Sequence, residues 1–142
     1  VEGDTYTDEP LAFLLEDASI KETISPYYMG RIVDFPAFIS SYPFKPDSEE
    51  REWEFELTDP IMECNCGDFS LRWDAAGNTI LERGGTRGET VRCDIQTLTA
   101  MFYGYKRPTY LKRVERLQAN DTAVRILEDI IPIEQPYFSD YF

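Results

Sequence analysis

The sequence contains no histidine, only three cysteines and few basic residues, and these shortages exclude several kinds of protein. Without histidine there is no Ser-His-Asp triad and no mixed Cys/His zinc site. Fourteen Lys and Arg stand against 27 Asp and Glu, a net charge of −13, so the surface repels nucleic acids and anionic membranes and attracts cationic partners. We expect no nucleic-acid partner and no membrane partner. Because an odd number of cysteines suits a reducing compartment, we expect a cytoplasmic protein.

Long apolar segments are also lacking. No stretch approaches the 18 apolar residues of a membrane-spanning helix. The chain begins at Val1 without a charged and then apolar leader, so we expect no signal peptide and interpret the chain as a piece of a longer protein. Its 142 residues are 42% hydrophobic, which suffices for the core of one globular domain.

The order of predicted elements indicates an α+β domain. Apolar residues alternate with polar ones over 52–58 and 69–74, the period of strands buried on one face. Further strands are predicted at 27–33, 79–82 and 90–93, and a turn at 76–78. Helices are predicted after the capping residues Asp34, Asp94 and Asp121 and from Pro108. Because strands precede helices without βαβ alternation, we expect the helices to pack on one face of the sheet.

Two segments resemble sites but lack the required pattern. Cys64, Cys66 and Cys93 are too few and wrongly spaced for structural zinc, so we interpret them as buried or bystander cysteines and expect no metal site. The segment Gly84–Gly88 follows a strand but does not open a helix, whose N-terminus would attract phosphate. We therefore predict a hairpin turn there.

A local basic cluster contrasts with the acidic chain. It consists of Lys106, Arg107, Lys112, Arg113 and Arg116. The cluster suits solvated helix faces, and it equally suits pairing with acids across a domain or subunit interface. The sequence leaves both interpretations open.

The last seven residues are unusually aromatic for a terminus. Tyr137, Phe138, Tyr141 and Phe142 each have about 150–250 Å² of surface that favours burial, and Phe142 bears the terminal carboxylate. We expect this tail to dock in a groove. It would serve either as a strap that completes the core or as the carrier of a functional carboxylate.

Three segments together resemble one known family. Residues 26–38 (PYYMGRIVDFPAF), 94–105 (DIQTLTAMFYGY) and the tail 136–142 (PYFSDYF) are similar, in this order, to the C-terminal part of the enhanced intracellular survival (Eis) type of GNAT N-acetyltransferases. The resemblance implies a sterol-carrier-protein-like α+β fold with a mostly antiparallel sheet over residues 26–142. Residues 1–25 then correspond to a linker and the tail of a preceding GNAT-like domain.

The resemblance also implies a role in catalysis. Members of this family bind acetyl-CoA in the first GNAT domain, acetylate amines that include aminoglycosides, and often assemble as homo-oligomers. Their terminal carboxylate reaches that domain and helps to take a proton from the cationic amine. This role falls on the carboxylate of Phe142, with Tyr141 and Asp140 as pocket neighbours. The acetyl-CoA loop and the catalytic Tyr have no counterpart in these residues, so we expect this segment alone to bind no cofactor and to be inactive.

Elementary chemistry supports this implied role. An amine attacks a thioester only after losing its proton, and a positioned acceptor assists that step. A free α-carboxyl has a pKa of about 3.3–3.7, and packing among aromatic rings raises it.

Two alternatives remain. A lipid-binding module of this fold would enclose an apolar cavity, although the large aromatics Trp53, Phe55, Trp73 and Phe102 predict a filled interior. A purely structural or oligomerisation domain would not need the terminal carboxylate.

Overall fold

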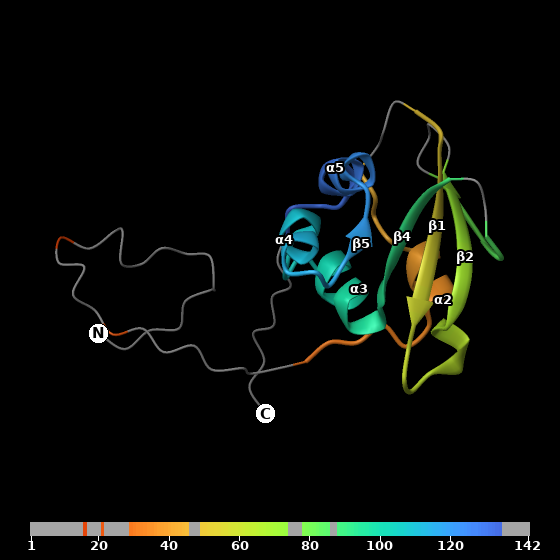
Figure 1. Cartoon of the computed structure of the whole chain (residues 1–142), viewed down its shortest axis with the longest axis horizontal. Helices are drawn as coiled ribbons and strands as arrows, with labels where there is room; N and C mark the ends of the chain where they lie inside the picture. Colours follow the sequence, from red (N-terminus) through yellow and green to blue (C-terminus); the bar gives the residue numbers. More distant parts are fainter. Residues whose placement is uncertain are drawn as a thin grey trace.

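The computed structural model describes residues 16, 21, 29–45, 49–73, 78–85 and 88–134, and only the backbone of Trp73. Over this part the chain forms one sheet and several short helices (Figure 1). In chain order the elements are α2 (Phe35–Ser40), β1 (Arg51–Thr58), the 3₁₀ turn η1 (Glu63–Asn65), β2 (Gly67–Trp73), β3 (Thr79–Arg83), β4 (Glu89–Asp94), α3 (Ile95–Phe102), α4 (Pro108–Arg113), β5 (Gln118–Ala119) and α5 (Asp121–Ile130).

The sheet has five strands in the order β3-β2-β1-β4-β5. Strands β1 and β2, β2 and β3, and β4 and β5 pair antiparallel. The central pair β1–β4 is parallel, with Trp53 opposite Glu89 and Leu57 opposite Cys93. The predicted α+β class and the mostly antiparallel sheet are therefore confirmed, although the sequence pattern did not reveal the parallel pair or the two-residue strand β5.

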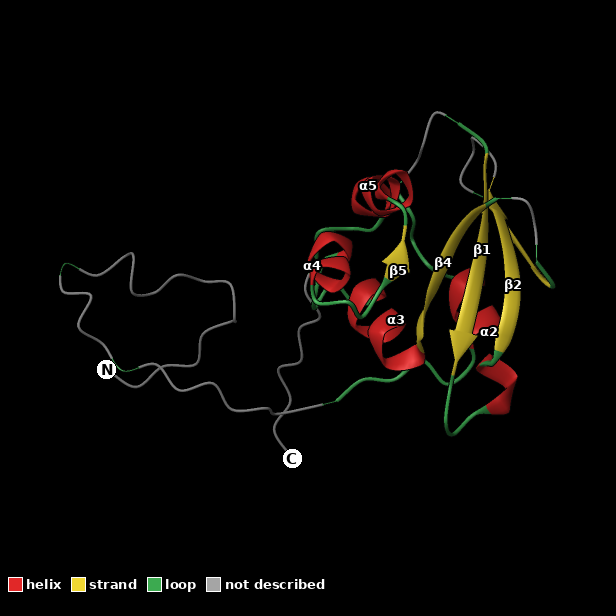
Figure 2. Cartoon of the chain, viewed as in Figure 1, coloured by secondary structure: helices red, strands yellow, loops and turns green. Residues whose placement is uncertain are grey.

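One face of the sheet forms the core. On β1 the side chains of Trp53, Phe55 and Leu57 are buried, whereas the acidic residues between them point to the other face. The buried face packs against the helices, which Figure 2 shows in red beside and behind the strands. The ring of Phe35 on α2 lies 5.7 Å from Phe55 and 5.2 Å from Phe69 between centroids. The predicted packing of helices on one face is confirmed.

Side-chain caps begin the helices close to where the sequence placed them. Asp34 accepts a hydrogen bond from the backbone N–H of Ala37 at 2.9 Å, and Asp94 accepts one from Thr97 at 2.7 Å. The third prediction was wrong by one residue. Asn120, not Asp121, caps α5, because its side chain accepts from the N–H of Ala123 at 2.7 Å.

Two further predictions were wrong. Residues 29–33, the described part of the predicted strand 27–33, form no strand, because their backbone bonds to side chains of other elements instead of to a neighbouring strand. The Gly84–Gly88 segment is no hairpin turn, since β3 and the following β4 are separated by β2 and β1. Gly88 passes so close to β1 that a Cβ there would lie 2.1 Å from the carbonyl oxygen of Glu52. Of the predicted turn at 76–78, residues 76 and 77 lie outside the described residues.

Candidate functional site

The three predicted site residues, Asp140, Tyr141 and Phe142, lie outside the described residues, which end at Glu134. The site that they would form therefore stays a prediction. The structure does describe the segment from which the tail departs, and also the segment that leads into the domain at its N-terminal side. These two places lie at the two ends of the described domain.

The tail departs from the C-terminal end of α5. The side chains of Ile130 and Ile131 are buried in the core, with 2% and 0% of their surfaces exposed. The N–H of Lys45 donates a hydrogen bond to the carbonyl of Ile130 at 2.8 Å. Ile131 is extended, as a residue before proline prefers to be, and Pro132 fixes the next φ angle. Ile131, the last buried residue that the structure describes, thus lies between the hydrogen-bonded Ile130 and the conformationally restricted Pro132.

Arg107, the N-cap residue of the neighbouring helix α4, binds the C-terminal end of α5. Its Nε donates to the carboxylate of Glu128 at 2.7 Å, and one terminal nitrogen donates to the backbone carbonyl of the same residue at 2.6 Å. The other terminal nitrogen lies 3.3 Å from the carbonyl oxygens of both Ile131 and Pro132. A cation that binds the free carbonyls of a helix C-terminus is favourable there. We name these four residues, Arg107, Glu128, Ile131 and Pro132, the tail anchor.

The charges in the tail anchor are fixed by hydrogen bonds. Burial alone would raise the pKa of Glu128, but the N–H of Thr109 donates to its carboxylate at 2.8 Å and Arg107 binds the other oxygen. These contacts hold the pKa of Glu128 below its usual value. Burial raises the pKa of nearby Tyr42 to about 12, and its hydroxyl donates to the carbonyl of Phe102 at 2.8 Å. At neutral pH these groups hold the chain in place and exchange no protons.

A second polar cluster fixes the segment that leads into the domain. Asp59, whose side chain is fully buried, accepts hydrogen bonds from the guanidinium of Arg31, from Asn65 at 2.8 Å, and from the N–H groups of Ile61 at 2.9 Å and Met62 at 3.0 Å. Burial acts to raise the pKa of Asp59, but these bonds outweigh it and hold the pKa well below the usual range.

Asn65 completes this cluster from the turn η1. It is fully buried, accepts from the N–H of Phe35 at 2.9 Å and donates to the carbonyl of Val33 at 3.3 Å. Thr99 of α3 accepts from the N–H of Ile32 at 3.2 Å. We name Arg31, Asp59, Asn65 and Thr99 the N-terminal network. It holds residues 31–35 against the sheet and α3, and thereby sets where the preceding part of the chain joins the domain.

A family model described as the sterol carrier protein domain matches residues 35–139. The chain belongs to this family. No curated protein matches the chain. Among solved structures, this sterol carrier protein domain is 30% identical to a conserved protein of Enterococcus faecalis described as a probable N-acyltransferase. The match covers 96% of this chain and 34% of that one, with a TM-score of 0.84.

Two other solved structures are similar over a comparable part of their length. A GCN5-related N-acetyltransferase from Anabaena variabilis is 29% identical, with 75% of this chain and 26% of that chain covered and a TM-score of 0.63. Eis1 from Mycobacterium abscessus is 20% identical, covers 96% of this chain and 34% of its own, and shares the fold with a TM-score of 0.70. The domain thus spans about a third of the chains that it matches, and the resemblance to the C-terminal sterol-carrier-like domain of Eis-type enzymes is confirmed.

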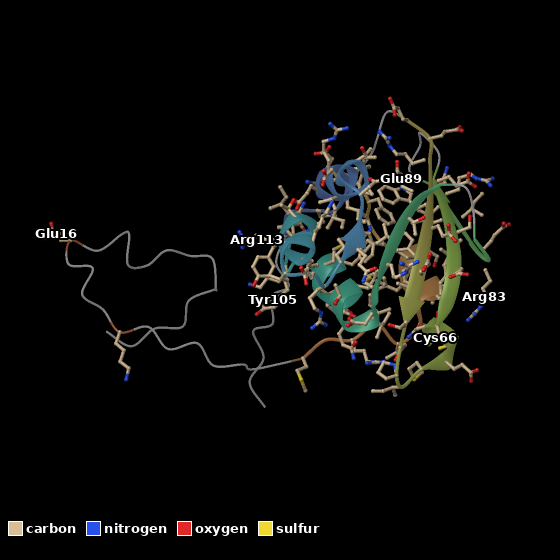
Figure 3. All side chains as sticks on the ribbon, viewed as in Figure 1. Glu16, Cys66, Arg83, Glu89, Tyr105 and Arg113 are labelled. Carbon is tan, nitrogen blue, oxygen red and sulfur yellow. The ribbon has the colours of Figure 1, made fainter. Side chains whose placement is uncertain are left out.

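The basic cluster of this sterol carrier protein domain binds mostly to the domain itself. Besides Arg107, Lys112 pairs with Asp121 at 2.5 Å and Arg116 pairs with Asp94 at 3.0 Å. Lys106 and Arg113 lie over tyrosine rings, 4.5 Å from the centroid of Tyr105 and 5.2 Å from that of Tyr110. Figure 3 shows the labelled Tyr105 and Arg113 together on the flank of α4. These contacts agree with partly solvated helix faces.

The cysteines have separate surroundings. Cys64 is exposed, and Cys66, labelled in Figure 3 near the start of β2, exchanges hydrogen bonds with the backbone of Asp59. Cys93 is buried, and burial raises its pKa to about 12. Within the described part, no three Cys, Asp or Glu residues form a group that could hold a metal ion. No helix in that part is long and apolar enough to cross a bilayer.

Sequence reasoning missed the two residues that organise these places. Glu128 belongs to one of several acidic pairs in a chain with 27 acids. Asn65 lies between Cys64 and Cys66, and only the cysteines were considered as candidate ligands. The sequence signal that was available for Arg107 was its place directly before Pro108, the residue that begins α4. No local signal marked Asn65.

Proposed function

We propose that this chain is the C-terminal domain of an acetyl-CoA-dependent N-acetyltransferase that acts on amines, and that it supplies the terminal carboxylate of Phe142 to the active site. Acetyl-CoA is bound by a preceding GNAT domain and not by this segment. The substrate is a cationic amine, with aminoglycoside-like compounds as candidates. The intact protein is a cytoplasmic homo-oligomer.

The observation that carries this proposal is the match to the probable N-acyltransferase of Enterococcus faecalis. Almost the whole of this chain aligns with about a third of that protein, at 30% identity and a TM-score of 0.84. This coverage supports the proposal that the chain is one domain of an enzyme about three times as long.

The chemistry requires a proton acceptor beside the attacking nitrogen. An amine is mostly protonated at neutral pH, so a carboxylate in the active site both attracts the cation and accepts its proton. A carboxylate in water is a weak base, with a pKa of about 3.3–3.7 for a chain terminus. Desolvation by rings such as those of Tyr141 and Phe142 would raise this pKa toward the working range.

The filled core weighs against lipid transport as the alternative. Trp53, Phe55 and Phe69 lie with at most 1% of their surfaces exposed, so large aromatic rings occupy the described core. Their rings touch those of α2 and α3, with the centroids of Phe55 and Phe102 6.4 Å apart. Retention of a fluorescent fatty acid by the intact protein, with no acetyl transfer to any amine, would favour the lipid alternative.

A single chemical change tests the role of the carboxylate. The intact protein is prepared with Phe142 as its C-terminal amide by ligation, so that every ring remains and only the charge is lost. We expect kcat/KM for acetyl transfer to an amine to fall by about 10²- to 10⁴-fold, the usual contribution of a general base. The matched control is the same ligation that restores the free carboxylate.

Two results would contradict the proposal. An amide with the same kcat/KM as the ligated control would show that the tail serves only folding or assembly. An intact protein that transfers no acetyl group from acetyl-CoA to amines would remove the enzymatic proposal altogether. The unfolding temperature of both ligated proteins is measured beside activity, since loss of folding would lower it.

A further inference from the structure

We propose that the outer face of the sheet, opposite the core, binds a small aliphatic diamine in a groove that contains the hydroxyl of Ser70. The groove has a volume of about 330 Å³ and is lined by Glu52 of β1, Ser70 and Arg72 of β2, Glu82 of β3 and residues 83–85. Figure 2 shows α2 behind the strands, so this outer face is turned toward the viewer. The inference does not rest on the proposed function, because it needs neither acetyl-CoA nor the C-terminal tail.

Ser70 supplies a buried polar group to the groove. Its neighbours on β2, Phe69 and Leu71, are buried in the core, so the alternation of the strand turns Ser70 to the outer face. Only 9% of the surface of Ser70 is exposed, and its hydroxyl forms no hydrogen bond with any residue that the structure describes. A donor bound in the groove would therefore take the place of water at this hydroxyl.

Two carboxylates flank this hydroxyl. Glu54 of β1 and Glu82 of β3 lie directly opposite Ser70 in the two antiparallel pairs, and such partners share one face of a sheet. Neither carboxylate forms an ion pair or hydrogen bond with another described residue. A Cβ on Gly85 would lie 2.4 Å from one carboxylate oxygen of Glu54, so this glycine leaves room for the carboxylate at the border of the groove. The groove thus contains two negative charges without a partner in the described part of the chain.

The two arginines that line the groove are already engaged. Arg72 lies 3.2 Å from the carboxylate of Glu52. The guanidinium of Arg83, labelled in Figure 3 at the edge of the sheet, lies 5.0 Å from the ring centroid of Phe69 and donates to the carbonyl of Cys64 at 2.5 Å. These contacts leave the two carboxylates beside Ser70 for a cation from outside the domain.

The spacing of the acceptors favours an organic cation over a metal ion. Within the described residues, no three Cys, Asp or Glu side chains are close enough to hold one metal ion. The Cβ atoms of Glu54 and Glu82 lie about 9–11 Å apart, since each is about 4.5–5.5 Å from that of Ser70. An ammonium group offers three donors, and a short chain with an ammonium at each end can reach both carboxylates. A diamine would neutralise both charges, whereas a monoamine would leave one unpaired.

The test is a ¹H–¹⁵N NMR titration of the full 142-residue chain with 1,4-diaminobutane, at an ionic strength of about 0.15 M to screen diffuse attraction. We expect the amide signals of Ser70, Gly84 and Gly85 to shift and to saturate with a Kd of about 1 mM, because a ligand of so few atoms gains little in an open groove. Butylamine, with one ammonium, should bind about threefold more weakly. The uncharged 1,4-butanediol should cause no shift.

Four variants locate the site. Ser70→Ala and Glu82→Gln should each raise the Kd about threefold to tenfold, since each removes an acceptor for the ligand. Arg72→Gln should lower the Kd, because it removes a cation from the groove and releases Glu52. The matched control is Asp129→Asn, which removes one charge from an exposed position on α5, away from the outer face, and should leave the Kd unchanged. Melting temperatures establish that every variant is folded during the titration.

Several results would overturn the diamine site. Shifts that do not saturate, or a Kd that rises equally in Asp129→Asn, would show diffuse attraction to an acidic surface. Displacement of the diamine by Mg²⁺ at the same ionic strength would show that charge alone is recognised. Equal affinity for Nα-acetyl-lysine amide would assign the groove to a lysine of a partner protein. An unchanged Kd in Ser70→Ala would remove the hydroxyl from the site. None of these results bears on the proposed function, which is tested by acetyl transfer in the intact protein.

Discussion

At the scale of single residues, Asn65 joins three separate parts of the chain through one side chain. It is fully buried, and its amide bonds to the N–H of Phe35, to the carbonyl of Val33 and to the carboxylate of Asp59. Removing it would leave buried polar groups without partners, and each such group costs about 1–3 kcal/mol. The consequence is that a residue with no chemistry of its own determines where the preceding chain meets the sheet.

We predict that Asn65→Ala lowers the free energy of unfolding by about 2–4 kcal/mol, a large fraction of a typical domain stability. The measurement is urea denaturation followed by tryptophan fluorescence. Cys64→Ser is the matched control, since Cys64 is exposed on the same turn and an exposed substitution changes stability by less than about 0.5 kcal/mol. Equal midpoints for Asn65→Ala and the wild type would contradict the account of the N-terminal network.

At the scale of elements, the beginning of α5 depends on one side chain. Asn120 accepts from the N–H of Ala123 in the first turn, whereas the side chain of Asp121 is wholly exposed and pairs with Lys112 at 2.5 Å. The sequence alone suggested Asp121 as the cap, but it could not separate Asp121 from Asn120, because Asn and Asp cap helices about equally well. The choice was settled by β5, whose pairing with β4 ends at Ala119 and leaves Asn120 as the first residue free to cap.

We predict that Asn120→Ala costs about 1 kcal/mol of stability, the usual value for a lost cap. Asp121→Ala should cost clearly less, because its ion pair is screened by solvent. Denaturation of both variants under the same conditions decides between them. A larger loss for Asp121→Ala would show that Asp121, as the sequence suggested, and not Asn120 caps α5.

At the scale of the whole molecule, acidic residues outnumber basic ones, and the fold keeps a few of these acids charged through hydrogen bonds. Hydrogen bonds hold the pKa values of Asp59, Asp94 and Glu128 below their usual values, although burial acts in the opposite direction at each. In the unfolded chain these groups regain ordinary pKa values of about 4. As the pH falls below about 4, the unfolded state therefore binds protons first, and stability is lost.

We predict that the urea midpoint is nearly constant between pH 8 and 5 and falls steeply between pH 4 and 2. Relief of repulsion in a chain of net charge −13 stabilises the fold only as the pH falls toward the isoelectric point of about 4.3. Below it the chain becomes positive, and repulsion adds to the loss from the three paired carboxylates. The difference in stability between the wild type and Asp59→Asn should narrow as the pH falls through this range. A midpoint that rises from pH 5 to pH 3 would show that repulsion dominates.

Local patterns predicted most of the fold, and contacts between distant residues account for the rest. The alternation around Trp53 and the caps Asp34 and Asp94 were visible because strand and helix periods act over a few residues. The parallel pairing of β1 with β4 and the Arg107–Glu128 contact join residues far apart in the chain, and no local period encodes them. The role of Phe142 rests on resemblance and stays a prediction.

The pairing of β1 with β4 also has a consequence for the order of folding. Strands β1, β2 and β3 pair with their neighbours in sequence, so this meander needs only short loops to close. Strand β4 must find β1 across the whole meander, and such distant closure carries a larger entropic cost and slows folding. Helices α3, α4 and α5 all follow β4. We therefore expect the contacts of Arg107 at the end of α5 to form late in folding, after the sheet has closed around β1.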